Sequence, residues 1–180
     1  MSTTTTSTEA APPTGNLVVD TWDIVKQIPN YEIVAGGILF RRVFDMAPGV
    51  HKLFKFGAEY EYGTPEFDKI YEQPAILAHY RSVIGTVDAA VQLVRSGDIA
   101  TLVSILNKLG RKHYYYGVRE AHFPVVGEAL LYTLEAALGV TVFTDETKKA
   151  WTDVYGIITT NMLEGGNAVE KEQAEKNHVQ

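Results

Sequence analysis

One long segment carries apolar residues at helical spacing, and this pattern restricts the fold more than any other feature of the sequence. From Pro74 to Arg95, apolar side chains recur every three or four residues. They are Ile76, Val83, Val87, Ala90, Val91 and Val94. Residues at this spacing share one side of an α-helix, so we expect an amphipathic helix whose apolar stripe lies in the core.

The rest of the chain divides into further helices with recognisable ends. We expect helices over 17–28, 31–44, 99–113, 123–138 and 145–163. Pro48 opens a short helix, Gly97 and Gly139 end two of the longer ones, and Asp98 and Thr144 cap the helices that follow. No segment alternates polar and apolar residues over a sustained length, so the sequence predicts an all-α fold.

Length and composition indicate one folded domain with polar ends. The chain has 180 residues, of which 46% are hydrophobic, enough for one sizeable core. We expect a disordered tail over 1–16, which is rich in Ser, Thr and Pro. The folded domain is expected over 17–165 and a polar tail over 166–180, with a frayed helix from Asn167 onward as the alternative. Within the domain, Lys55–Tyr71 is a long polar and aromatic connection in which Thr64 and Pro65 are typical of a helix start.

Charge and cysteine content argue against several kinds of partner and cofactor. The formal net charge is −6, which disfavours nucleic acid and anionic membrane surfaces. There is no cysteine, which excludes disulfides, iron–sulfur clusters and covalently attached c-type haem. Neither a signal peptide nor a membrane-spanning run is visible, so we expect a cytoplasmic protein that does not associate with membranes.

Two histidines lie on the predicted apolar stripes. His79 shares its face with Ile76 and Val83, and His113 follows Leu109 at a spacing of four. An unsatisfied buried imidazole costs about 1–3 kcal/mol, so each needs a partner. A single histidine in this setting is more often a core residue bonded to a carbonyl. Two of them on separate helices favour a haem site, because imidazole binds haem iron and the macrocycle is mostly apolar.

The other histidines carry no such signal. We expect His51 to be exposed, His122 to lie at the surface or near a haem carboxylate, and His178 to lie in the C-terminal tail. No phosphate loop, nucleophile elbow or metal-hydrolase spacing occurs in the sequence.

Around the two stripe histidines the sequence resembles neuroglobin-type globins. The matching segments are Leu109–His113 with Gly117–Val118, His79–Val83 with Val87–Val91, Val126–Glu135, and Trp151 with Tyr155; upstream they are Trp22, Phe40, Phe44, Pro48 and Leu53–Phe54. The resemblance covers about 17–163. It implies a globin fold, with helices A to H packed around a haem pocket.

The resemblance also implies roles for individual residues. His113 would be the proximal iron ligand, and His79 either the distal iron ligand or a hydrogen-bond donor to a bound gas. Residues expected to contact a non-covalent haem b are Phe40, Phe54, Val83, Val118, Phe123, Val126 and Tyr155. For Tyr155, a core position with a bonded hydroxyl is an equally good interpretation. In neuroglobin-like members the distal histidine binds the iron when no gas is present.

The sequence departs from the family pattern near the expected haem edge. The stretch between Phe54 and His79 is long, Phe56 stands where relatives often have tyrosine, and Ser82 stands where they often have lysine. Candidates to meet the haem carboxylates are Arg81, Lys112 and Lys55, each better explained as a solvated surface charge when considered alone. The sequence offers no explanation for the run Tyr114–Tyr116.

Three kinds of function follow from these observations. The first is reversible binding of O2, CO or NO for oxygen storage, transport or scavenging. The second is a haem redox enzyme or electron carrier, for nitrite reduction or NO dioxygenation, which would require an external reductase. The third is a gas or redox sensor. With neither a reductase nor an output domain in the sequence, the first is favoured and the protein is expected not to be an enzyme. We expect a monomer or a weak homo-oligomer.

Overall fold

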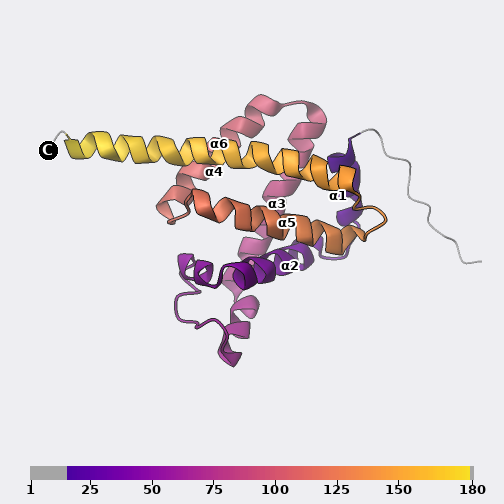
Figure 1. Ribbon diagram of the computed structural model, residues 1–180, viewed down its shortest axis with the longest axis horizontal. Helices are drawn as coiled ribbons and strands as arrows, with labels where there is room; N and C mark the ends of the chain where they lie inside the picture. The colour runs from indigo at the N-terminus through magenta and orange to yellow at the C-terminus, as the bar shows by residue number, and fades with distance from the viewer. Residues whose placement is uncertain (1–15, 179–180) are drawn as a thin grey trace, which may run out of the picture.

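The computed structural model describes residues 16–178, which fold into helices joined by short turns (Figure 1). The α-helices are α1 (Leu17–Val25), α2 (Tyr31–Met46), α3 (Pro74–Ser96), α4 (Ile99–Tyr115), α5 (Phe123–Leu138) and α6 (Asp145–His178); the 3-10 helices are η1 (Pro48–Leu53), η2 (Pro65–Glu72) and η3 (Glu120–His122). These residues contain no strand, which confirms the all-α prediction. None of their helices is long and apolar enough to cross a bilayer. Of the tail expected over 1–16, residues 1–15 lie outside the described residues. Asn16 does not belong to a tail, because its side chain caps α1 by accepting a hydrogen bond of 3.3 Å from the Val19 N–H.

Local sequence signals determine several helix ends. Gly97 ends α3 in the left-handed region, at φ 74°, where a residue without a side chain is favoured. The Asp98 side chain then caps α4 by accepting a hydrogen bond of 3.1 Å from the Thr101 N–H. The Thr144 hydroxyl accepts from the Thr147 N–H at 3.3 Å and caps α6. These predicted ends are confirmed.

Two predicted boundaries differ from the structure. The first helix was expected to continue to Ile28 but ends at Val25, because the next residues form tighter turns with an Ile28 N–H to Val25 carbonyl bond of 3.1 Å. Pro65 begins η2 as expected. Thr64 does not cap it, since its hydroxyl donates to the Glu61 carbonyl at 2.7 Å instead.

The main core joins the two ends of the folded region. Trp22 of α1 and Trp151 of α6 are almost fully buried, and their ring centroids lie 5.7 Å apart. Each indole N–H has a partner: Trp22 donates to Asp88 at 2.8 Å and Trp151 to Thr21 at 3.0 Å. Around this centre α2 packs against α3 and α5, while α4 packs along α6.

The buried side of α3 is rotated from the predicted stripe. Ile76, Ala90 and Val91 are buried as expected, but so are Tyr80 and Ile84, which the stripe did not include. Of the expected stripe, Val83, Val87 and Val94 are only half-buried, like His79. The reason is a close approach of α2, where a Cβ on Gly36 would overlap the Tyr80 side chain. Tyr80 therefore enters the core, and its neighbours His79 and Val83 lie at the edge of it.

The last helix is much longer than predicted. We expected it to end near Leu163 and the residues from 166 to form a polar tail or a frayed helix. The structure has a continuous helix here, because α6 continues to His178 and extends past the body of the molecule (Figure 1). Contacts with α4 explain the difference. Val169 is fully buried, and Arg111 of α4 forms a two-pronged pair with Glu172 at 3.0 and 2.9 Å. These contacts with a distant part of the sequence stabilise the end of the helix, which its polar composition alone would not stabilise.

The prediction that His51 is exposed is wrong, because only 2% of this residue is accessible to solvent. Its Nδ1 contacts the Pro48 carbonyl, and its Nε2 lies 2.9 Å from the Tyr60 carbonyl. The ring also packs edge-on against Phe67, with centroids 5.1 Å apart. His51 thus links the long connection before α3 to the core. The spacing of apolar residues in a short helix does not reveal this role.

Candidate functional site

Three of the predicted site residues gather on the side of α3 next to the core. His79 lies between Phe40 of α2 and Phe54, which follows η1, with ring centroids 5.1 Å away from each. The two phenylalanine centroids are 5.9 Å apart. Both phenylalanine side chains are purely apolar. The His79 imidazole therefore has aromatic neighbours on two sides, and neither of them can form a hydrogen bond with it.

His113 occupies the last turn of α4 with a fixed orientation. Its Nδ1 lies 2.9 Å from the carbonyl of Leu109, one turn earlier. A carbonyl can only accept, so Nδ1–H donates and Nε2 keeps its lone pair. Metal-binding histidines commonly have this arrangement, since the carbonyl fixes the ring and makes the other nitrogen a better donor to a metal.

Both imidazoles are neutral near pH 7. Burial, together with the nearby charge of His113, lowers the pKa of His79 to about 4. Burial also lowers the pKa of His113, with a smaller contribution from Lys112, although the Leu109 carbonyl opposes this. Neutral imidazole is the form that binds metals.

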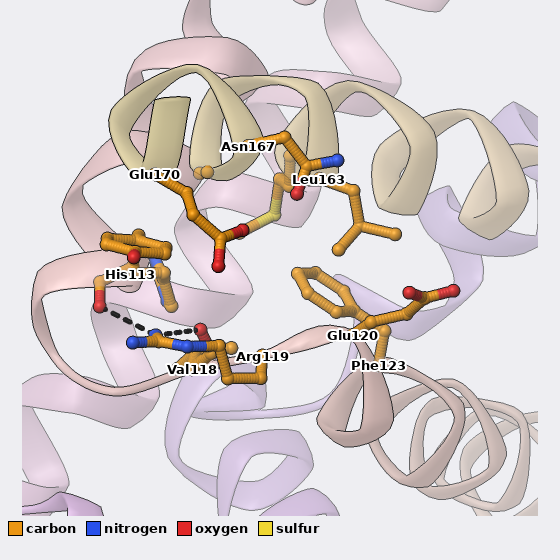
Figure 2. Close-up of a pocket in the computed structure, with 12 residues that line it drawn as sticks. His113, Val118, Arg119, Glu120, Phe123, Leu163, Asn167 and Glu170 are labelled. Carbon is orange, nitrogen blue, oxygen red and sulfur yellow. Dashed lines mark hydrogen bonds between the residues drawn. The ribbon is translucent and has the colours of Figure 1, made fainter. Parts of the chain in front are cut away.

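A small cavity of about 40 Å³ lies beside His113, between the end of α4 and α6 (Figure 2). Val118 and Phe123, two predicted haem contacts, line it together with Met162 and Leu163. The polar residues around it are Arg119, Glu120, Asn167 and Glu170. Proximal lining residues predicted from the sequence therefore do meet at His113.

Arg119, which the sequence analysis missed, closes the turn after α4. Its guanidinium donates to the carbonyls of Tyr114 and Val118 at 2.9 and 2.8 Å, shown dashed in Figure 2. It also lies over the Tyr114 ring, 4.1 Å from the centroid. The His122 ring, half-buried, accepts from the Arg119 N–H at 2.8 Å. The sequence does not distinguish an arginine that binds the carbonyls at a helix end from an arginine that is exposed to solvent.

The remaining predicted contacts are Val83, Val126 and Tyr155. Tyr155 donates to the Phe123 carbonyl at 2.7 Å and is absent from the cavity lining, which supports the core interpretation. Val83 and Val126 are half-buried against the main core. Their haem contacts stay predictions.

The three residues proposed to meet the haem carboxylates have different surroundings. They are Arg81, Lys112 and Lys55. Arg81 and Lys55 are exposed, and neither has an ion pair within residues 16–178. The Lys112 ammonium lies 5.9 Å from the centroid of the exposed Tyr116 ring. Two residues of the unexplained tyrosine run, Tyr115 and Tyr116, are thus at the surface, while Tyr114 is covered by Arg119.

The donor set fits a haem better than another metal centre. It offers two neutral imidazoles, His79 and His113, from different helices, with phenylalanine rings on one side. No group of three or more His, Asp or Glu side chains within residues 16–178 could hold a metal ion. Haem iron needs only one or two axial nitrogens in apolar surroundings, which these residues can supply.

Comparison with known proteins supports the same family. A family model described as Globin matches residues 38–162. The chain is a globin. This globin is 32% identical to neuroglobin of Danio rerio over 149 residues, which are 83% of this chain and 87% of the relative. It is also 34% identical to an anaerobic nitrite reductase of Gossypium hirsutum over 141 residues, covering 77% and 82% of the two chains.

A solved structure shares the fold. A hexacoordinated heme protein from an anhydrobiotic tardigrade, determined at pH 4, superposes with a TM-score of 0.71 at 21% identity, covering 87% of this chain and 96% of the other. At that identity the match supports the fold alone. Together with the family model, these comparisons confirm the globin fold and the neuroglobin-like resemblance.

Proposed function

We propose that this globin holds one non-covalent haem b between His113 and His79 and binds diatomic gases reversibly. The observation that carries the proposal is His113, whose Nδ1 is engaged by the Leu109 carbonyl while Nε2 keeps its lone pair. With no cysteine in the chain, the cofactor would be held by contacts and axial ligation alone.

When bound, haem would supply an iron centre for O2, CO or NO. His113 would hold the iron through Nε2, and the Leu109 carbonyl would keep the ring from rotating. Phe40 and Phe54 would exclude water from the side of His79 and offer no competing hydrogen bond. The neutral state of both histidines favours ligation over protonation at pH 7.

We propose that His79 would be a second ligand to the iron when no gas is present. Its lowered pKa keeps the nitrogen lone pair available, and the aromatic surrounding provides no alternative partner. The resemblance to neuroglobin-type globins, in which the distal histidine binds the iron when no gas is present, supports this state. A gas must then compete with His79, so the apparent affinity falls with the fraction of open sites.

Redox chemistry is the second candidate. It is favoured by the 34% identity to a protein named anaerobic nitrite reductase. Nitrite reduction consumes electrons, so this chain would need an external donor. The two candidates share the same two histidines and differ in whether an electron donor is supplied.

A haem titration of purified protein with the proximal variant tests the proposal. The parent chain is expected to take up one equivalent of haemin, release it into acidic organic solvent, and bind CO stoichiometrically after reduction. His113→Ala should retain little haem, because the ligand oriented by Leu109 is lost. His122→Ala is the matched control and should bind like the parent, since its ring contacts the Arg119 backbone instead. Full haem retention with an unchanged spectrum in His113→Ala would refute the proximal assignment.

A further inference from the structure

The helix that carries His113 touches α6 backbone to backbone. A Cβ atom on Gly110 would overlap the carbonyl group of Met162, and one on Gly165 would overlap the carbonyl of Asn107. Glycine is therefore required on both helices for them to approach this closely. A contact between backbones cannot relax by a change of rotamer, so the spacing of α4 and α6 is fixed here.

This contact lies directly beside the proposed proximal ligand. Gly110 is three residues before His113 and so occupies the neighbouring turn of α4. On the other side of the contact, Arg111 pairs through both guanidinium nitrogens with Glu172 of α6, at 3.0 and 2.9 Å. The Tyr114 hydroxyl reaches Gln173 at 3.5 Å. The turn with His113 is thus held by α6 at several points.

We propose that residues 162–173 of α6, here called the proximal clamp, are a positioning element for His113. The proximal clamp fixes the position and tilt of α4 relative to α6, and thereby the position of the His113 imidazole nitrogen. Its effect on an iron bond rests on the proposed function, whereas its effect on α4 rests on these contacts alone. The segment includes residues that the sequence predicts to be a tail, so this role becomes visible only when the two helices are seen together.

Matched alanine substitutions on α6 test the clamp. Gly165→Ala inserts a methyl group against the Asn107 carbonyl, whereas Gly156→Ala has no other atom within 4 Å of the new methyl. Both changes raise helix propensity equally, so they differ only in the contact with α4. Both substitutions are made in the His79→Leu background, where the ferrous iron is five-coordinate and the iron–imidazole stretching band can be measured. We expect Gly165→Ala to shift this band and to speed haem loss roughly tenfold, the size of effect seen when the groups that orient a metal ligand are disturbed. Gly156→Ala should match the parent in both measurements.

A second pair of variants needs no haem. Glu172→Gln weakens the pair with Arg111, and Glu164→Gln on the same helix is its control, since Glu164 is exposed. In the haem-free chain, hydrogen exchange of the 110–115 amides is expected to be several-fold faster in Glu172→Gln and in Gly165→Ala than in the controls.

The outcomes separate the clamp from the proposed function. Failure of the parent chain to bind haem removes the proposed function, while the exchange experiment still decides the clamp. Should Gly165→Ala not fold, Glu172→Gln carries both measurements. The clamp is refuted when the folded variants keep the parent's exchange rates and iron–imidazole band, even if their melting temperatures change.

Discussion

At the scale of single residues, the proposed ligation by His79 would determine how a gas reaches the iron. With His79 as the second ligand, CO must wait for it to dissociate, so the observed CO rate should level off at high CO concentration. His79→Leu removes this ligand and should give a rate that rises linearly with CO, measured by stopped-flow or flash photolysis. O2 should also leave faster, because the hydrogen-bond donor is lost. A linear dependence in the parent protein would contradict six-coordination.

The lowered pKa of His79 makes the haem-free chain sensitive to acid. In the unfolded chain this group has its ordinary pKa of 6.5, whereas in the folded chain the pKa is about 4. Between these two pH values the unfolded state binds a proton that the folded state does not. The free energy of unfolding therefore falls by up to about 1.4 kcal/mol for each unit by which the pH is lowered. Above pH 6.5 there is no loss, and below pH 4 no further loss from this group.

Urea denaturation of the haem-free chain at pH 7, 6 and 5 measures this effect. His79→Leu should lose less stability than the parent over that range, and the difference should come to about 2 kcal/mol at pH 5. His122→Ala, with a half-buried surface histidine changed, serves as the control. Equal pH dependence in His79→Leu and the parent would show that His79 is not buried as described.

The sequence could identify His79 and His113 because each lies on an apolar stripe, and the family resemblance then assigned their roles. It could not predict the burial of His51, whose partners, the carbonyls of Pro48 and Tyr60, belong to an irregular segment. The burial of Tyr80 was also not predicted. The spacing of apolar residues on α3 determines which side of the helix is buried only to within about one residue. The packing of Gly36 decides which side is buried.

At the scale of elements, side-chain caps begin helices at defined residues. The Thr144 hydroxyl accepts from the Thr147 N–H at the start of α6. Thr144→Ala should lower the free energy of unfolding by about 1 kcal/mol, a typical value for a lost N-cap. Thr160→Ala, at an exposed position of the same helix, should have little effect or a slightly favourable one. Urea midpoints compare the two variants, and equal values would refute the cap.

Helix starts and ends were predictable wherever the signal is local. Gly97 and Asp98 separate α3 from α4, and Phe123–Leu138 is found as predicted for α5. The sequence left the end of α6 open between a polar tail and a frayed helix, because two adjacent glycines and a polar sequence do not indicate a stable helix when considered alone. What stabilises that segment is contact with α4, far away in the sequence, as in the Arg111–Glu172 pair at a separation of 61.

At the scale of the whole molecule, the buried apolar residues form two clusters, and α3 and α6 contribute to both. One is the main core, which includes Trp22, Phe44 and Trp151. The other is a smaller cluster formed by α4 and α6 with their neighbours, which includes Leu106 and Met162. His79 comes from α3, which contributes mainly to the first cluster, and His113 from α4, whose buried residues Leu102 and Leu106 belong to the second. A haem held by both histidines would link α3 to α4, and binding would therefore stabilise the folded chain.

The absorption spectrum of the reduced, gas-free protein, recorded after one equivalent of haemin is added, tests the central claim most directly. Ligation by His79 and His113 together predicts complete uptake and sharply split visible bands typical of a six-coordinate ferrous haem. His79→Leu should turn these into a single broad band, and His113→Ala should lose the cofactor. No uptake by the parent protein would contradict the haem site itself, and a broad five-coordinate spectrum would contradict ligation by His79.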